Sequence, residues 1–104
     1  MKNKVALVCS NYYENITEGL INGARDKLDP CFDVEVFLVD GAWELIYKIN
    51  QLSKNNSFDK FIAIGVIVKG DTDHYEYISK SVADGLINLT IHNNIYIANC
   101  VLNV

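Results

Sequence analysis

An uninterrupted apolar run at residues 61–68 constrains the fold of this chain more than any other stretch. The run places no polar side chain on either face, which is typical of a strand buried on both sides in a parallel sheet. It ends at Lys69 and Gly70, and a short polar segment then leads into apolar residues at helical spacing. The stretch therefore predicts a central strand that passes through a turn into a helix.

The rest of the chain alternates between short apolar runs and amphipathic patterns with helical spacing. We predict strands at residues 4–9, 34–39, 60–68 and 95–102, and helices at about 16–28, 42–52 and 73–92. Strands that alternate with helices through short loops form a parallel sheet with right-handed crossovers. The sequence therefore predicts one α/β domain over residues 1–104: a three-layer, open parallel sheet of the flavodoxin-like type, with strand order 2-1-3-4 and three helices.

This strand order leaves the two faces of the sheet unequally covered. The first helix lies on one face, whereas the second and third helices lie on the other. Because both faces of a parallel sheet are normally buried, we expect a partner or further C-terminal helices to cover the first face. Within the first helix, Gly19 and Gly23 each lower helix stability by about 1 kcal/mol relative to alanine. We predict that they allow this helix to pack closely on the sheet.

The composition argues against several classes of protein. The 104 residues have a net charge of −4 and no basic run, which argues against nucleic-acid binding. The apolar runs are too short for a membrane span, and residues 1–10 lack the apolar region of a signal peptide, so we expect a cytoplasmic protein. Cys9, Cys31 and Cys100 lie far apart, which favours buried thiols in a reducing compartment over a metal site.

The carboxyl ends of the predicted strands form the candidate site, because open α/β sheets bind ligands there. Polar and aromatic residues gather after three of the strands, at residues 10–15, 40–44 and 66–74. Within the third segment, residues 70–72 precede a helix, where backbone N–H groups favour a bound phosphate. His74 is the histidine near these strand ends, and its ordinary pKa near neutrality suits proton transfer.

Each of these residues also has a purely structural interpretation. Tyr12 and Tyr13 suit surface positions beside a helix start, and Trp43 suits a core position beneath the second helix. Glu44 falls in the first turn of that helix, where a carboxylate interacts favourably with the helix dipole. Residues 73–76 read Asp-His-Tyr-Glu, which is close to a capping box. Residue patterns alone therefore leave both structural and functional roles open.

Three stretches match, in order, the motifs of one known family. Residues 12–17 read Tyr-Tyr-Glu-Asn-Ile-Thr and correspond to an aromatic loop before Ile-Thr. Residues 40–44 read Asp-Gly-Ala-Trp-Glu, where the family has Pro-Gly-Ala-Phe-Glu. Residues 65–77 resemble Gly-x-Val-Ile-Arg-Gly-x-Thr-x-His-x-x-Tyr without a gap, with Lys69 in place of the arginine. Along nearly its whole length, the chain resembles the 6,7-dimethyl-8-ribityllumazine synthase family (riboflavin synthase beta chain) of riboflavin biosynthesis.

The resemblance implies a transferase that condenses 5-amino-6-ribitylamino-2,4-pyrimidinedione with 3,4-dihydroxy-2-butanone 4-phosphate. The products would be 6,7-dimethyl-8-ribityllumazine, phosphate and water, formed without a metal or other cofactor. The amine of the substrate is already a nucleophile, so positioning and one acid–base group suffice. The resemblance also implies small-molecule partners, neither nucleic acid nor membrane, and a pentamer-based homo-oligomer with sites between subunits.

Roles for individual residues follow from the same resemblance, position by position. His74 is expected to be the catalytic residue that transfers protons. The expected substrate contacts are Tyr12 for the pyrimidine ring, Gly41, Ala42, Trp43 and Glu44 for the ribityl chain, Val66, Ile67 and Val68 for the edge of the heterocycle, and Asp71 and Thr72 for the phosphate. Asn99 occupies the position of a fourth-strand aromatic residue that family members lend to a neighbouring site.

Members of the family continue beyond the fourth strand into two helices, which carry a phosphate-binding arginine and a lysine. We therefore expect a C-terminally short version of the domain, and this leaves a second hypothesis open. In that alternative, the chain is a catalytically impaired or truncated homologue that binds a pyrimidine or a flavin, or an assembly subunit.

Overall fold

The computed structural model describes residues 3–55, 58–71 and 74–104. Within these ranges, four strands alternate with three α-helices: β1 (Asn3–Ser10), α1 (Glu14–Leu28), β2 (Phe32–Val39), α2 (Glu44–Lys54), β3 (Lys60–Ile67), α3 (Tyr75–His92) and β4 (Tyr96–Asn103). A single 3-10 turn, Lys69–Asp71, follows β3 in this part of the chain. None of the helices formed by the described residues is long and apolar enough to cross a membrane.

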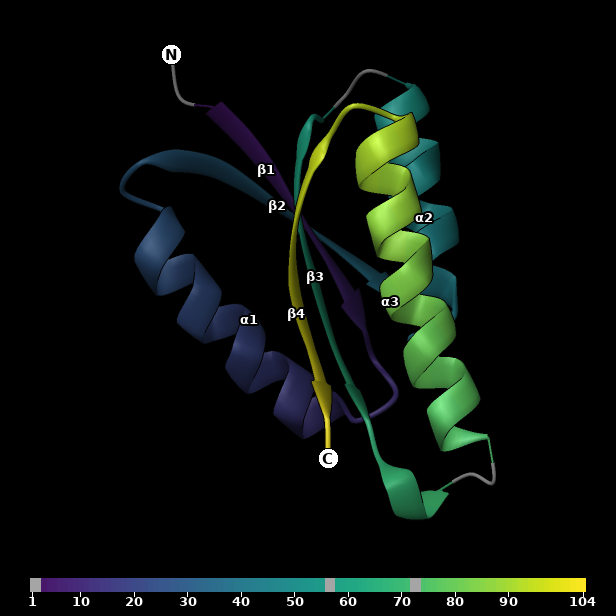
Figure 1. Ribbon diagram of the computed structural model, residues 1–104. Helices are drawn as coiled ribbons and strands as arrows, with labels where there is room; N and C mark the ends of the chain where they lie inside the picture. The colour runs from purple at the N-terminus through teal and green to yellow at the C-terminus, as the bar shows by residue number, and fades with distance from the viewer. Residues whose placement is uncertain (1–2, 56–57, 72–73) are drawn as a thin grey trace.

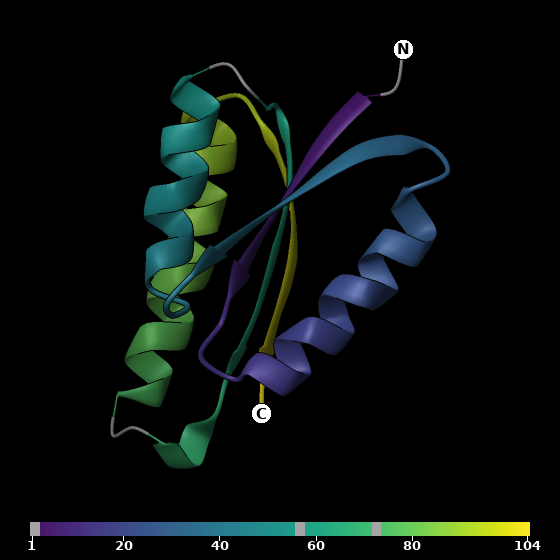
Figure 2. The same cartoon turned by 180° about the vertical axis from the view of Figure 1, so that it is seen from behind.

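The strands form one parallel sheet in the order β2-β1-β3-β4, as predicted. One row of paired residues crosses all four strands, because Cys9 pairs with both Leu38 and Ile64, and Ile64 pairs with Cys100. Figure 1 shows α1 on one face of the sheet and both α2 and α3 on the other. The view from behind agrees (Figure 2), so the predicted three-layer, flavodoxin-like architecture is confirmed.

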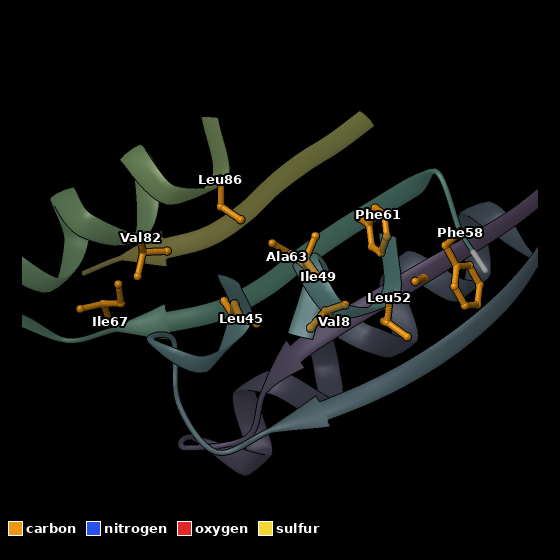
Figure 3. Packing of buried hydrophobic residues seen from close by; sticks show 11 residues of the cluster. Val8, Leu45, Ile49, Leu52, Phe58, Phe61, Ala63, Ile67, Val82 and Leu86 are labelled. Carbon is orange, nitrogen blue, oxygen red and sulfur yellow. The ribbon is translucent and has the colours of Figure 1, made fainter. Parts of the chain in front are cut away.

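The larger part of the core lies between the sheet and the α2–α3 layer. Figure 3 shows this cluster, which comprises Ala6, Val8, Leu45, Ile49, Leu52, Phe58, Phe61, Ala63, Ile67, Val82 and Leu86. The two helices approach each other closely at Gly85, where an added Cβ would lie 2.9 Å from Cδ1 of Ile46. A residue without a side chain at this position therefore allows α3 to pack against α2.

The two helices of this layer are also joined at the C-terminal end of α3. The Asn93 side chain donates hydrogen bonds to Oδ1 of Asn50 at 2.9 Å and to Oγ of Ser53 at 2.8 Å. Asn94 follows with a φ of 53°, the left-handed conformation that asparagine tolerates after a helix. The prediction that these two asparagines end the third helix is confirmed.

The smaller part of the core lies beneath α1. Leu20, Ile21, Ala24 and Leu28 of the helix pack on Val5, Leu7, Cys9 and Ile64 of the sheet. Burial raises the pKa of the Cys9 thiol from 9.0 to about 12, so Cys9 behaves as a small apolar residue, as predicted. The prediction of buried thiols is wrong for Cys31 and Cys100, which are exposed.

The prediction that Gly19 and Gly23 allow close packing of α1 on the sheet is wrong. An added Cβ at either glycine would have no atom of the structure within 4 Å. Both glycines border an open apolar cavity of about 420 Å³ that also contacts Ile62, Ile64 and Cys100. The reason is the position of α1, which packs on β1, β2 and the near side of β3 and leaves the β4 side of this face open within the described chain.

Candidate functional site

A cavity of about 350 Å³ opens at the carboxyl ends of the strands, where the sequence predicted a site. It is lined by Tyr12, Tyr13, Asp40, Gly41, Ala42, Trp43, Glu44, Val66, Ile67, Val68 and Ile78. Eight of these residues belong to the predicted substrate contacts, and they come from the segments that follow β1 and β2 and from the end of β3. The fold therefore brings together residues that lie more than fifty positions apart in the chain.

One wall of the cavity comes from the loop between β1 and α1. The buried Thr17 hydroxyl donates a 2.7 Å hydrogen bond to the carbonyl oxygen of Ser10, which joins the first turn of α1 to the end of β1. The backbone N–H of Asn11 donates to the Val39 carbonyl at 2.8 Å, which joins the same loop to β2. Between these bonds, the rings of Tyr12 and Tyr13 meet edge to face with centroids 4.9 Å apart. The loop therefore presents a fixed aromatic pair to the cavity.

Another part of the lining comes from the turn between β2 and α2. The Gly41 carbonyl accepts the N–H of Glu44 at 3.1 Å, which starts the helix. An added Cβ on Gly41 would lie 3.1 Å from Oε1 of Glu44, so glycine leaves room for that carboxylate above the turn. The alternative that placed Trp43 in the core is wrong, because 53% of this residue is exposed.

The floor of the cavity is the apolar end of β3. Val66 and Ile67 are buried, whereas Val68 is half-buried. Just before them, an added Cβ on Gly65 would lie 3.2 Å from Cβ of Ser10. The ends of β1 and β3 therefore approach closely beneath the cavity because residue 65 is a glycine.

The structure describes only part of the turn after β3, residues 70–72, which was predicted to bind phosphate. Lys69–Asp71 form a 3-10 turn, so Asp71 lies directly after the end of β3. The backbone N–H of Lys69 donates to the carbonyl oxygen of Val104 at 2.8 Å, which ties the turn to β4. Thr72 lies outside the described residues, as does Asp73 of the proposed capping box.

His74 immediately precedes α3 and is exposed. Its carbonyl oxygen accepts the backbone N–H of Ile78 at 2.8 Å, and Ile78 lines the cavity. His74 itself is not one of the lining residues. His74 therefore lies one helical turn before a residue of the cavity lining, and its role in proton transfer stays a prediction.

Asn99 lies apart from the other predicted site residues. It sits in the middle of β4, paired with Ala63, and is exposed. Its Oδ1 atom accepts the backbone N–H of Val101 at 2.9 Å, so the side chain bonds to its own strand. Asn99 does not line the cavity described above, and its contact with substrate stays a prediction.

Sequence reasoning missed several residues of the site. Tyr13, Asp40 and Ile78 line the cavity but were not predicted to contact substrate. Tyr13 and Asp40 could have been predicted, because each is next in sequence to a predicted site residue. Tyr77 was quoted only as the end of a motif, yet its ring stacks on Trp43 with centroids 5.9 Å apart and an interplanar angle of 26°. No local pattern relates these two positions.

The chemistry of the cavity suits a flat, hydroxylated ligand. Its floor is apolar and its walls are aromatic, which favours a planar ring. The charged residues that line it, Asp40 and Glu44, are both acidic and provide acceptors for hydroxyl groups. The acidic rim would repel a phosphate group, so the cavity itself favours an uncharged, hydroxylated ligand.

Comparison with known proteins identifies a family for this chain. The family model described as 6,7-dimethyl-8-ribityllumazine synthase matches residues 2–104. Proteins with that name are similar to this chain in Limosilactobacillus reuteri (strain DSM 20016), at 35% identity over 88% of the chain, and in Xylella fastidiosa (strain M12), at 33% identity over 97%. A third, from Buchnera aphidicola subsp. Baizongia pistaciae (strain Bp), is 35% identical over 93% of the chain.

The matched region spans 62%, 68% and 64% of the length of these three relatives, respectively. The similarity nevertheless extends across nearly all of the present chain and includes every segment that forms the cavity. Because the family model matches nearly the whole chain and relatives of that name are 33–35% identical to it, this chain belongs to the 6,7-dimethyl-8-ribityllumazine synthase family.

Proposed function

We propose that this protein is a lumazine synthase. It condenses 5-amino-6-ribitylamino-2,4-pyrimidinedione with 3,4-dihydroxy-2-butanone 4-phosphate and produces 6,7-dimethyl-8-ribityllumazine. The observation that carries the proposal is the convergence of the predicted pyrimidine and ribityl contacts on one strand-end cavity. The relatives that bear this name support the same reaction.

The pyrimidinedione binds in the cavity at the strand ends. A volume of about 350 Å³ lies within the range of small-molecule sites, and the apolar floor and aromatic walls suit a flat heterocycle. In this proposal the ring stacks on Tyr12, and its edge meets Val66, Ile67 and Val68. The ribityl hydroxyls bond to the 41–44 turn, where the Glu44 carboxylate is an acceptor.

The second substrate binds next to the turn after β3. Asp71 and Thr72 contact its phosphate group through the backbone in this proposal, and Lys69, an exposed cation of the same turn, offsets the charge. This position places the phosphate away from the acidic rim formed by Asp40 and Glu44.

The reaction demands little from the protein beyond positioning. The 5-amino group attacks the ketone carbon of the second substrate, forms a C–N bond and releases the carbonyl oxygen as water. Elimination of phosphate then leaves an enol that becomes a new carbonyl group. The ribitylamino nitrogen attacks this carbonyl carbon, and loss of a second water closes the ring. His74 transfers the protons that these steps require. Its place immediately before α3, one turn from the cavity-lining Ile78, supports this role.

The protein works in the cytoplasm as a pentamer-based homo-oligomer in this proposal. Free thiols at all three cysteines support a reducing compartment. Ile87 and Ile91, which are exposed and lie one turn apart on α3, support burial against another subunit. Asn99 would then face a neighbouring site.

The direct test is absorbance of the lumazine product when both substrates are supplied to the purified protein. We expect turnover that is lost in His74→Ala. A well-folded protein without turnover would contradict the proposal. In that case, titration calorimetry with the pyrimidinedione and with riboflavin tests the alternative. Heat of binding with either ligand would indicate a catalytically impaired homologue that still binds it.

A further inference from the structure

The rings of Trp43 and Tyr77 stack across the gap between α2 and α3. Their centroids are 5.9 Å apart and their planes differ by 26°, an offset-stacked arrangement. Both are largely exposed, at 53% and 63%, so burial in the core does not explain the contact. The stack therefore needs another explanation.

Trp43 borders two cavities. One is the strand-end cavity, which Trp43 lines together with Tyr12 and Tyr13. The other has a volume of about 220 Å³ and is lined by Trp43, Ile46, Ser81, Val82 and Gly85. Because the residue borders both cavities and is 53% exposed, the surrounding core encloses its side chain only in part. A contact on its exposed side is needed to keep it at the strand-end cavity.

Tyr77 provides that contact at the N-terminal end of the helix pair. Further along, Gly85 in the middle of α3 meets Ile46 in the first turn of α2. At the C-terminal end of α3, Asn93 bonds to α2. The Trp43–Tyr77 stack is the corresponding contact at the start of both helices. It joins the turn that carries the cavity wall to the first turn of α3.

We propose that Tyr77 is a positioning residue, which holds the Trp43 indole as a wall of the substrate cavity. Tyr77 does not line the cavity and acts through Trp43. Its effect on catalysis rests on the proposed lumazine synthase function, whereas its effect on the indole does not. Loss of the tyrosine ring releases the indole toward solvent or toward the second cavity, which weakens binding of the flat substrate.

The sole tryptophan of the chain makes the proposal directly measurable. In Tyr77→Leu, we expect red-shifted emission from Trp43 and faster quenching by acrylamide. We also expect binding of the pyrimidinedione, measured by calorimetry, to weaken about twofold to tenfold, the change that corresponds to loss of an aromatic pair. KM for this substrate should rise by a similar factor, with a smaller change in kcat.

Two variants serve as controls. Tyr77→Phe keeps the ring and should restore the emission, quenching and affinity of the wild-type protein. Tyr47→Leu removes an equally exposed tyrosine one turn beyond Trp43 on α2 and should leave all three readouts unchanged. If circular dichroism shows that Tyr77→Leu is unfolded, Tyr77→Gln replaces it, because glutamine is a good helix former.

The outcomes separate this proposal from the proposed function. Unchanged emission and affinity in a folded Tyr77→Leu protein would overturn it, as would equal changes in Tyr47→Leu. If the wild-type protein neither binds the pyrimidinedione nor turns over, the proposed function fails. The emission and quenching of the same variants, which need no ligand, then still decide whether Tyr77 positions Trp43.

Discussion

The hydroxyl of Thr17 donates a 2.7 Å hydrogen bond to the main-chain carbonyl of Ser10, and both residues are only 1% exposed. The bond links the first turn of α1 to the last residue of β1. The intervening loop contributes Tyr12 and Tyr13 to the cavity. A single buried bond thus couples the stability of the fold to the shape of the candidate site.

Replacement of Thr17 by valine should destabilise the protein. The Ser10 carbonyl would stay buried without this donor, which costs about 1–3 kcal/mol. We expect this loss in the free energy of unfolding, measured in urea. Thr90→Val is the matched control, because the Thr90 hydroxyl makes the same type of bond to the Leu86 carbonyl at a less buried position on α3. Equal losses in the two variants would contradict the special role of the buried bond.

Alanine at Gly65 should destabilise the sheet beneath the cavity. The new Cβ would lie 3.2 Å from Cβ of Ser10, so the ends of β1 and β3 must move apart. We expect a loss of about 1–3 kcal/mol in urea unfolding, as for other overpacked cores. Gly19→Ala is the matched control, since its Cβ has open space and helix propensity should raise stability by about 1 kcal/mol. A destabilised Gly19→Ala protein would refute the open packing seen at α1.

Replacement of Gly85 by alanine should destabilise the protein. A second substitution, at Ile46, should recover part of that loss. The added Cβ would meet Cδ1 of Ile46 at 2.9 Å. Ile46→Val removes that atom and alone should cost about 0.5–1.5 kcal/mol. Because the two side chains compete for the same space, the double variant should be more stable than the sum of the single changes predicts. Strict additivity in thermal or urea unfolding would show that the helices do not meet at these residues.

Cys9 should make the stability of the protein fall at alkaline pH. Burial raises the pKa of its thiol from 9.0 to about 12. Above pH 9 the unfolded chain therefore releases a proton that the folded chain retains, so the free energy of unfolding decreases as pH rises from 9 toward 12. Cys9→Ala should lower stability at pH 8 but remove this part of the pH dependence. Urea unfolding under reducing conditions at pH 8, 9 and 10 measures both effects, and parallel pH profiles for the two proteins would contradict the assignment.

The fold and much of the cavity could be predicted from sequence because local patterns specify them. The apolar run at residues 61–68 has the composition of a strand buried on both faces, and it became the central strand β3. Helical spacing of Leu20, Ile21, Ala24 and Leu28 identified the face of α1 that packs on the sheet. In an open parallel sheet, the strand ends then determine which loops meet, so Tyr12, Trp43 and Val66 were predicted to meet and do line one cavity.

Contacts between elements could not be predicted in the same way, and the glycines illustrate this. Gly19 and Gly23 have the spacing of a packing motif but face open space, whereas Gly65 and Gly85 lie at close contacts that no pattern marked. Likewise, Trp43 is exposed and stacks on Tyr77, although the two lie far apart in the chain. The sequence by itself determined the elements, their order and the family, because periodicity and motifs are local. Only the tertiary structure decided which glycines are crowded and which ring supports the cavity wall, because these depend on how far apart the packed elements lie.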